Sequence, residues 1–442
     1  MKSLTILSSL SLSCLVVCGC TTPAEVAERN QFSPDAAQTQ PEYVRSNTPA
    51  DSNPGISDTD YANFIADSNR FGLELYQRIN SDLSLTDRNG VFSPASVELA
   101  LAMTYVGAEG DTAAAMKSTL HDNLGSGVYH VACNRLQRDL LSRNYTHDFG
   151  GGNVHRIELA PANSLWTDLT FTVKNAYLDL LSQEYDTGVY RVNFVDWPDP
   201  SRLAINGWVM DHTHDKIQEL LMPGDVNSVT RAVLVNALYF FGNWSTLFSK
   251  SATQPGTFHT LGGTDVTANL MHGATQSLKY KTDANLTVLQ LPYVNGDLWM
   301  TVVLPSSGQF EAERAQISEA WLSQMTTGIS DTDVQVTIPK FGITTDQIRL
   351  KDSLAALGMS PAFSKGFTGI SNETLFIGDV IQKAFIGVDE EGTEAAAATA
   401  VTFAGAVPQQ PVPVTIDRPF LFFIQDKTGI VLFAGQVVDP TL

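Results

Sequence analysis

Positive charge is scarce in this sequence. The 442 residues carry 27 Lys and Arg against 47 Asp and Glu, which gives a formal net charge of −20 at pH 7. Because phosphate binding needs a basic face, this balance argues against nucleic acid as a partner. The charge favours solubility but says nothing about the fold. With 43% hydrophobic residues, most of the chain can bury a sizeable core.

The local signatures of catalysis are also absent. The chain has no G-x-S-x-G, S-x-x-K or H-E-x-x-H pattern and no Walker loop, so no motif indicates an enzyme, a cofactor or a cell-wall hydrolase. His212 and His214 form an H-x-H pair without a Cys or acidic cluster at ligand spacing, so we expect exposed histidines rather than a metal site. A Ser/His/Asp triad dispersed along the chain leaves no local signature, and that alternative stays open.

The N-terminus carries export information. An apolar stretch over residues 4–17 follows one Lys, which is typical of a secretory signal and too short to span a membrane. Residues 17–20, Val-Cys-Gly-Cys, are similar to the bacterial lipobox; a leader with a plain cleavage site is the alternative. Thr21, where Asp would retain the protein, resembles the outer-membrane sorting pattern. We therefore predict a lipoprotein signal peptide at 1–19 and an exported protein anchored through lipidated Cys20. Its expected place is the outer membrane or cell surface, with release to the extracellular space as an alternative.

We expect the mature chain to have one free cysteine thiol. Cys14 and Cys18 leave with the leader, Cys20 is acylated, and Cys133 remains. One thiol cannot form an intramolecular disulfide, so the fold must rest on its core even in a compartment that permits disulfides. We expect Cys133 to be buried.

Two regions follow the leader. Residues 20–57 are rich in Pro, Ala, Gln, Asn, Asp, Ser and Thr, which predicts a flexible tether. Residues 58–442 show a globular pattern without a second linker or an internal repeat, which predicts a single domain.

Helical periodicity comes early in the domain and strands come late. Over residues 61–79 the apolar side chains on one helical face are Phe64, Phe71, Leu75 and Ile79. Residues 285–293, 298–305 and 333–343 are typical of strands. This order predicts an α+β fold with large sheets.

One stretch near the C-terminus, "EEGTEAAAATAVTFAGAVPQQPVPV" at 390–414, contradicts its own propensity. Its first half consists of strong helix formers, yet it has almost no large apolar residue that could pack on a core. Its second half consists mainly of small, β-branched and proline residues. Local propensity therefore does not explain the stretch.

The segment "VDEEGTEAAAATA" resembles the hinge of the serpins, a family of protease inhibitors with an exposed reactive loop. Further segments resemble the family in its own order: "NGVFSPASVELALAMTYVGAEGDT", "ANSLW", "INGWVMDHTHDKI", "VLVNALYFFGNW", "LQLPYVNGDLWMTVVLP", "IPKFGI", "LKDSLAALGM" and "DRPFLFFIQDKTGIVLFAGQVVDP". The resemblance covers roughly residues 60–442. It implies an α+β serpin fold with several helices around three β-sheets and a reactive-centre loop at about 390–414.

The resemblance also implies a mechanism. The loop is cleaved while joined to a serine protease as an acyl-enzyme, and its N-terminal part then enters the central sheet and distorts the protease. The hinge residues implied are Glu391, Gly392, Thr393, Glu394, Ala395, Ala396, Ala397 and Ala398. Because strand residues alternate faces, the side chains expected to face the core are Thr393, Ala395, Ala397, Thr399, Val401 and Phe403. None of them is charged, so none would be buried as an unpaired ion.

Serpins have a set of polar residues beneath the central sheet and a tryptophan at the place where that sheet opens. The matching residues here are Ser93, Ser96, Asn236, Trp244 and Gln382. Gln382 departs from the pattern because the family usually has His there. Gln can donate and accept hydrogen bonds toward Ser93, Ser96 and Asn236, but it cannot become charged near neutral pH.

The family's spacing from the hinge places the reactive bond at Ala406–Val407, and counting back from "DRPF" shifts it toward Val407 or Pro408. A small residue before the bond suits an elastase-like or subtilisin-like protease. A trypsin-like target is disfavoured because Arg and Lys are absent from 401–414, while Phe403 leaves a chymotrypsin-like target open.

The sequence thus predicts an inhibitor of serine endopeptidases rather than an enzyme. Its partners would be a target protease, in a covalent acyl complex, and a membrane, and it would be a monomer. The alternative is a non-inhibitory serpin that acts as a surface binding or chaperone-like protein and whose loop never inserts.

Overall fold

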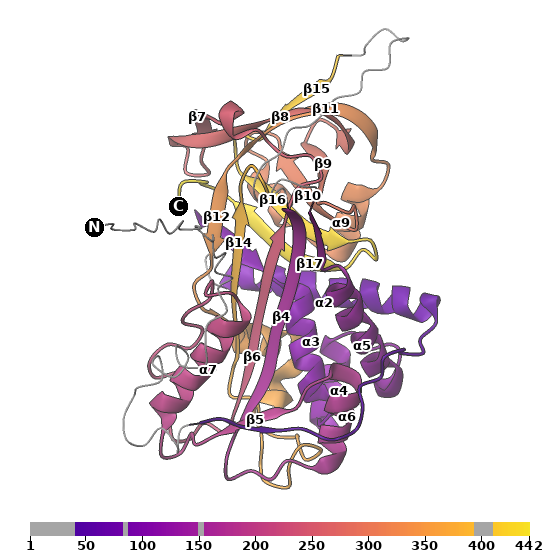
Figure 1. Ribbon diagram of the computed structural model, residues 1–442, viewed down its shortest axis with the longest axis vertical. Coiled ribbons are helices and arrows are strands. Elements are labelled where there is room, and N and C mark those ends of the chain that lie inside the picture. Colours follow the sequence, from indigo (N-terminus) through magenta and orange to yellow (C-terminus); the bar gives the residue numbers. More distant parts are fainter. Residues whose placement is uncertain (1–39, 83–86, 149–153, 393–409) are drawn as a thin grey trace, which may run out of the picture. The chain divides into compact units, whose positions relative to one another are not determined.

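A computed structural model of the chain describes residues 40–82, 87–148, 154–392 and 410–442 (Figure 1). One compact unit runs from Pro41 to Leu442. Its α-helices are α2 (Asp58–Asp82), α3 (Pro94–Tyr105), α4 (Gly110–Thr119), α5 (Ser126–Ser142), α6 (Asn175–Tyr185), α7 (Pro198–His212), α8 (Phe310–Arg314), α9 (Glu319–Thr326) and α10 (Lys351–Leu354). Across the described ranges, no helix has the length and apolar character that a membrane span requires.

The strands follow the same chain order. They are β1 (Glu42–Val44), β2 (Gly90–Phe92), β3 (Tyr145–Asp148), β4 (Val154–Asp168), β5 (Val189–Val192), β6 (Ala232–Gly242), β7 (Gln254–His259), β8 (Asp265–Thr282), β9 (Leu286–Pro292), β10 (Leu298–Pro305), β11 (Ser330–Pro339), β12 (Phe341–Thr344), β13 (Ile348–Arg349), β14 (Val380–Val388), β15 (Val412–Thr415), β16 (Phe420–Asp426) and β17 (Val431–Val437). The α+β class predicted from the sequence is confirmed.

The central sheet has eight strands in the order β1-β5-β4-β6-β14-β12, with β3 and β13 added at its margins. β4 and β6 form its long antiparallel pair, and β14 and β12 are also antiparallel. Between these two pairs, β6 and β14 run parallel. The middle of the sheet is therefore a parallel pair between antiparallel neighbours (Figure 1).

The second sheet has nine strands in the order β15-β11-β8-β9-β10-β16-β17-β2, with β7 paired to β8. Its 18-residue strand β8 pairs with β7 and β11 along most of its length and with β9 at its C-terminal end. The resemblance implies three sheets. Hydrogen bonds along β8 join two of them into one continuous ladder, so the described residues form two sheets.

The apolar faces of α2 and α3 form part of the main hydrophobic core. All residues of α3 are buried, as expected for a helix that is apolar on every side, and α3 contacts β4, β6 and β17. In α2 the predicted apolar face is buried as a whole: Phe64, Phe71, Leu75 and Ile79 are each at most 2% exposed. Cys133 of α5 is also buried, as predicted, and burial raises the pKa of its thiol well above the usual value.

Two strand predictions hold and a third needs a correction. Residues 285–293 and 298–305 correspond to β9 and β10, whereas 333–343 forms two strands in different sheets. β11 ends at Pro339, which has no amide hydrogen to continue a ladder. The backbone N of Lys340 donates to the carbonyl oxygen of Asn269 at 2.8 Å, and the chain then enters β12.

The domain begins earlier than its composition predicts. Within the predicted tether, β1 pairs antiparallel with β5. Arg45 donates to the hydroxyl of Ser182 at 3.1 Å and pairs with the carboxylate of Asp186 at 2.5 Å. The polar composition of this segment predicts a flexible tether. Backbone and side-chain hydrogen bonds attach it to the domain instead of an apolar face. The compact unit therefore starts at Pro41 rather than at residue 58, and the leader and Cys20 lie outside the described residues.

An aromatic cluster joins the edge of the central sheet to α7. The ring of Tyr190 on β5 stacks on Trp166 of β4 with centroids 4.5 Å apart, and Tyr43 of β1 lies 4.7 Å from Tyr190. From α7, Trp208 donates its indole N–H to the Tyr190 hydroxyl at 2.9 Å. The cluster fixes the position of α7 on this face of the sheet.

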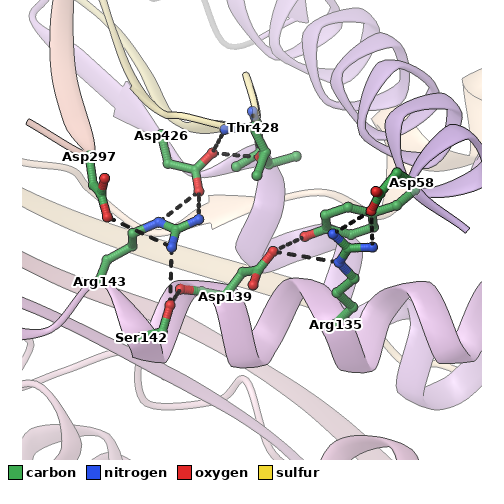
Figure 2. Close-up of polar contacts among 10 residues, drawn as sticks. Asp58, Arg135, Asp139, Ser142, Arg143, Asp297, Asp426 and Thr428 are labelled. Atoms are coloured by element: carbon green, nitrogen blue, oxygen red, sulfur yellow. Dashed lines mark hydrogen bonds and ion pairs between the residues drawn. The ribbon is translucent and has the colours of Figure 1, made fainter. Parts of the chain in front are cut away.

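A buried ion pair ties the end of α5 to the second sheet (Figure 2). Arg143 Nη2 lies 2.9 Å from Asp426 Oδ2, with the two side chains 6% and 0% exposed. The other carboxylate oxygen of Asp426 accepts hydrogen bonds from the backbone N and the hydroxyl of Thr428, at 2.8 and 2.5 Å. Arg143 Nη1 also donates to the hydroxyl of Ser142 at 3.1 Å, and Asp297 lies 4.0 Å away, so Asp426 is the one carboxylate in close contact with the Arg143 charge among the described residues.

Candidate functional site

The parallel pair β6–β14 is closed at one end of the sheet and unpaired at the other. The ladder joins Val380–Ala384 to Leu234–Leu238. Each strand continues for four further residues, to Gly242 and Val388, and no ladder pair is described between these residues. The upper part of β14 pairs only with β12 on its other side. The two strands therefore part toward their C-terminal ends (Figure 1).

A polar network lies beneath the closed part. Gln382 Nε2 donates to Asn236 Oδ1 at 2.6 Å and to the carbonyl oxygen of Ser93 at 3.0 Å, and Gln382 Oε1 accepts from the backbone N of Ser93 at 3.1 Å. Asn236 in turn donates to the hydroxyl of Ser96 at 2.6 Å and to Asn163 Oδ1 at 2.7 Å. Gln382 thus reaches Ser93 and Asn236 directly, as expected, but reaches Ser96 only through Asn236.

Every member of this network is an amide or a hydroxyl. Ser93, Ser96, Asn236 and Gln382 are at most 2% exposed, and their donors and acceptors are paired with one another or with the backbone. Buried polar groups are costly unless paired, so the network holds β14, β6 and α3 in one arrangement. Asn163 is the member that sequence reasoning missed, although it lies in the "ANSLW" segment.

A tight turn follows the end of β14. The backbone N of Gly392 donates to the carbonyl oxygen of Asp389 at 3.2 Å, and the backbone N of Glu391 donates to Asp389 Oδ1 at 3.1 Å. Gly392 has a φ of 54°, which L residues rarely adopt. A Cβ at this position would lie 2.5 Å from Asn243 Cα and from Trp244 N. Glycine is therefore required both by the turn and by its contact with the end of β6.

The turn is held against the residues that follow β6. The carbonyl oxygen of Glu391 accepts from Asn243 Nδ2 at 3.0 Å and from the backbone N of Trp244 at 3.4 Å. Trp244 Nε1 donates to the carbonyl oxygen of Asp389 at 3.0 Å. These bonds fix the last described residues before position 393 where β6 and β14 separate. We call this place the mouth of the sheet.

Two lysines neutralise the two glutamates of the turn. Glu390 pairs with Lys340 at 2.8 Å and accepts from the hydroxyl of Thr253 at 2.8 Å, while Glu391 pairs with Lys250. Both glutamates are about 5% exposed or less. Burial raises the pKa of Glu390, but the bonds from Lys340 and Thr253 outweigh it and hold the pKa below its usual value. Burial raises the pKa of neighbouring Asp389.

The residues that sequence reasoning missed share one property. Asn243, Lys250, Thr253 and Lys340 are far from the hinge in sequence and meet it only through the fold. Asn243 and Lys340 do lie inside recognised segments, "FFGNW" and "IPKFGI", but neither letter alone indicates a contact with the hinge.

The remaining predicted residues fall into two groups. Thr393, Glu394, Ala395–Ala398, Ala406 and Val407 lie outside the described residues, as does most of the loop. His212 and His214 are exposed, as expected, and His214 pairs with Glu158 at 2.7 Å. Over the parts of the chain that the structure describes, no three His, Cys, Asp or Glu side chains are placed to hold a metal ion.

The parallel direction of β6 and β14 determines how a strand placed between them would pair. A chain that leaves β14 through a tight turn toward β6 would run antiparallel to both strands. An added strand would therefore replace one parallel pair by two antiparallel pairs, which are slightly more stable per residue.

Comparisons with known proteins agree with this architecture. The profile of the family described as "Serpin (serine protease inhibitor)" matches residues 66–440. The chain belongs to the serpin family. Serpins are generally protease inhibitors and not enzymes.

Individual serpins match over most of their length. An uncharacterized serpin-like protein of Thermococcus kodakarensis is 36% identical over 378 residues, which is 84% of each chain. Leukocyte elastase inhibitor A of Mus musculus is 34% identical over 386 residues, covering 84% of this chain and 97% of that protein. The crystal structure of the thermophilic serpin tengpin in the native state gives a TM-score of 0.76 at 25% identity, covering 90% of this chain and 100% of that one.

Proposed function

We propose that this serpin inhibits serine endopeptidases as a suicide substrate. A target protease cleaves the reactive loop and stays bound as an acyl-enzyme, and the loop then enters the central sheet between β6 and β14. The observation that supports this most is the turn ending at Gly392, which lies against the end of β6 where the two strands part. The described chain therefore ends, before position 393, where the ladder between β6 and β14 has stopped.

The composition of the hinge supports the same proposal. Residues that follow Gly392 on the face toward the core carry no charge over 393–403, and the first of them are small. Small side chains can pass between packed strands, whereas a buried unpaired charge costs several kcal/mol. A non-inhibitory serpin has no such need.

The target class follows from the reactive bond, which we place at Ala406–Val407. We expect a covalent, detergent-resistant complex with an elastase or a subtilisin and none with trypsin, because a small residue fits a shallow primary pocket. Gel electrophoresis and mass spectrometry of the released fragment measure both. A complex with trypsin alone would contradict the proposal, as would cleavage mapped outside 403–408.

Heat stability separates the inhibitory from the non-inhibitory serpin. Cleavage of the loop should raise the melting temperature sharply if the loop inserts, because the new strand replaces one parallel ladder by two antiparallel ladders. A binding or chaperone-like serpin would keep its melting temperature after the same cut.

The N-terminus supports a second proposal, which concerns location. Lipobox resemblance at Cys20 predicts attachment through acyl chains, and more than one chain gives stable anchoring. We expect Cys20→Ala to move the protein from the membrane fraction to the soluble fraction while inhibition in solution stays unchanged. A wild-type protein that is already soluble and carries no acyl chain would show that the leader is cleaved at a plain site.

A further inference from the structure

We infer that Asn243 is a positioning residue for loop insertion: its side-chain amide holds the turn at the mouth of the sheet so that the chain beyond Gly392 enters between β6 and β14. The inference rests on the proposed inhibitory function. It adds a residue whose contribution is to guide the strand, separate from the residues that enter the sheet.

The side chain of Asn243 is fixed in one orientation by two backbone groups. Its Oδ1 accepts from the backbone N of Arg156 at 2.6 Å, and its Nδ2 donates to the carbonyl oxygen of Glu391 at 3.0 Å. A backbone N–H needs an acceptor and a carbonyl needs a donor, so the reverse orientation of the amide would lose both bonds.

The backbone of Asn243 is equally constrained. Its N donates to the carbonyl oxygen of Arg156 at 3.0 Å, and its own carbonyl accepts from the backbone N of Val294 at 2.7 Å. The residue is 1% exposed. Asn243 therefore links the start of β4 to the turn through hydrogen bonds on both sides. It directly follows β6, so both of its neighbours in this link belong to the central sheet or end it.

The bond from Asn243 to Glu391 would guide insertion rather than prevent it; we call these two possible roles a guide and a lock. The bond reaches a main-chain atom of Glu391, before the first residue that would enter the sheet, so insertion from 393 onward does not require it to break. Trp244 holds the other end of the turn through the carbonyl oxygen of Asp389. With both ends fixed, fewer residues have to be ordered before the first new ladder bond forms, and preorganisation of this kind lowers the barrier.

Two substitutions test the guide. Asn243→Asp keeps the acceptor for Arg156 N but turns an oxygen toward the Glu391 carbonyl, and Asn243→Ala removes both bonds. We expect each to slow insertion by about two- to tenfold, because each loses the one hydrogen bond that reaches the turn at Glu391. The number of inhibitor molecules consumed per subtilisin or elastase molecule inactivated should rise. The rate of initial loop recognition should not change.

Asn69→Ala is the matched control. Asn69 makes the same pair of bonds, donating to the carbonyl oxygen of Gly429 at 2.9 Å and accepting from the backbone N of Val431 at 2.8 Å, and it contacts no residue of the turn. It should lower the melting temperature without changing the number of inhibitor molecules consumed. That split separates a guiding role from a general loss of stability.

Two results would overturn the inference. One is wild-type stoichiometry in both Asn243 variants; the other is a lower stoichiometry with faster spontaneous insertion, which would make Asn243 a lock. If the wild-type protein forms no covalent complex with any protease, the proposed function fails separately. If the loop-cleaved wild type nevertheless gains heat stability, the rate of that gain tests the guide and should be slower in the Asn243 variants than in the wild type and in Asn69→Ala. If the cleaved wild type gains none, its loop does not insert and the inference is overturned as well.

Discussion

We expect Thr393→Arg to convert the protein from an inhibitor into a substrate. Residue 393 follows the turn that ends at Gly392, so its side chain would be the first to enter the sheet, on the face toward the core. A buried arginine without a partner costs on the order of several kcal/mol. Inhibition is a race between insertion and deacylation, and about 1.4 kcal/mol on the insertion barrier slows it roughly tenfold. The variant should be cleaved at the same bond and release active protease.

Glu394→Arg is the matched comparison. It introduces the same side chain one residue later, on the face expected to point to solvent, so its effect should be far milder. Titration of residual protease activity and the yield of covalent complex measure both variants. Equal inhibition by both variants and the wild type would show that insertion does not start from this hinge.

We expect Asp426→Asn to give the largest loss of stability, about 3–5 kcal/mol in the free energy of unfolding. The substitution keeps the shape of the side chain but leaves the Arg143 charge buried against a neutral group. The Ser142 hydroxyl still accepts from Arg143 Nη1 at 3.1 Å, and the nearest remaining carboxylate described is Asp297, at 4.0 Å (Figure 2). Chemical denaturation of the uncleaved protein, with the transition midpoint and slope compared to those of the wild type, measures the change.

An exposed ion pair supplies the control. Lys279 and Asp331 lie 2.9 Å apart with side chains 49% and 65% exposed, so Asp331→Asn should cost less than about 1 kcal/mol. Replacing both buried partners, as in Arg143→Met with Asp426→Leu, should cost less than Asp426→Asn because no unpaired charge remains. If Asp426→Asn is as mild as Asp331→Asn, the buried pair does not stabilise the link between α5 and the second sheet.

Local pattern predicted those parts of the fold whose cause is local. The apolar face of α2 repeats with the helical period, and β9 and β10 have the residue types of strands, so each could be recognised without knowledge of its neighbours. The boundary at Lys340 could not, because 333–343 has one strand-like pattern although its two halves pair in different sheets.

Contacts between distant segments account for what the sequence did not predict. β1 has three residues and too little apolar surface to stand out, and it is held by pairing with β5. The resemblance identified Trp244 and Gln382 because the family repeats them or their position. Asn243 and Lys250 contact Glu391 through one amide and one ammonium group, and the identity of a single polar residue does not indicate which distant segment it contacts.

The aromatic cluster under α7 gives the molecule a built-in optical reporter. The ring centroids of Trp208 on α7 and Trp166 in the central sheet lie 6.2 Å apart, and Tyr190 packs against both and accepts a hydrogen bond from the Trp208 indole. A strand added between β6 and β14 must shift β4, β5 and β6 relative to β14, and α7 rests on that moving part. Any change in how α7 lies on the sheet alters the surroundings of two indoles, so the emission of these tryptophans would follow the movement in real time without an attached label.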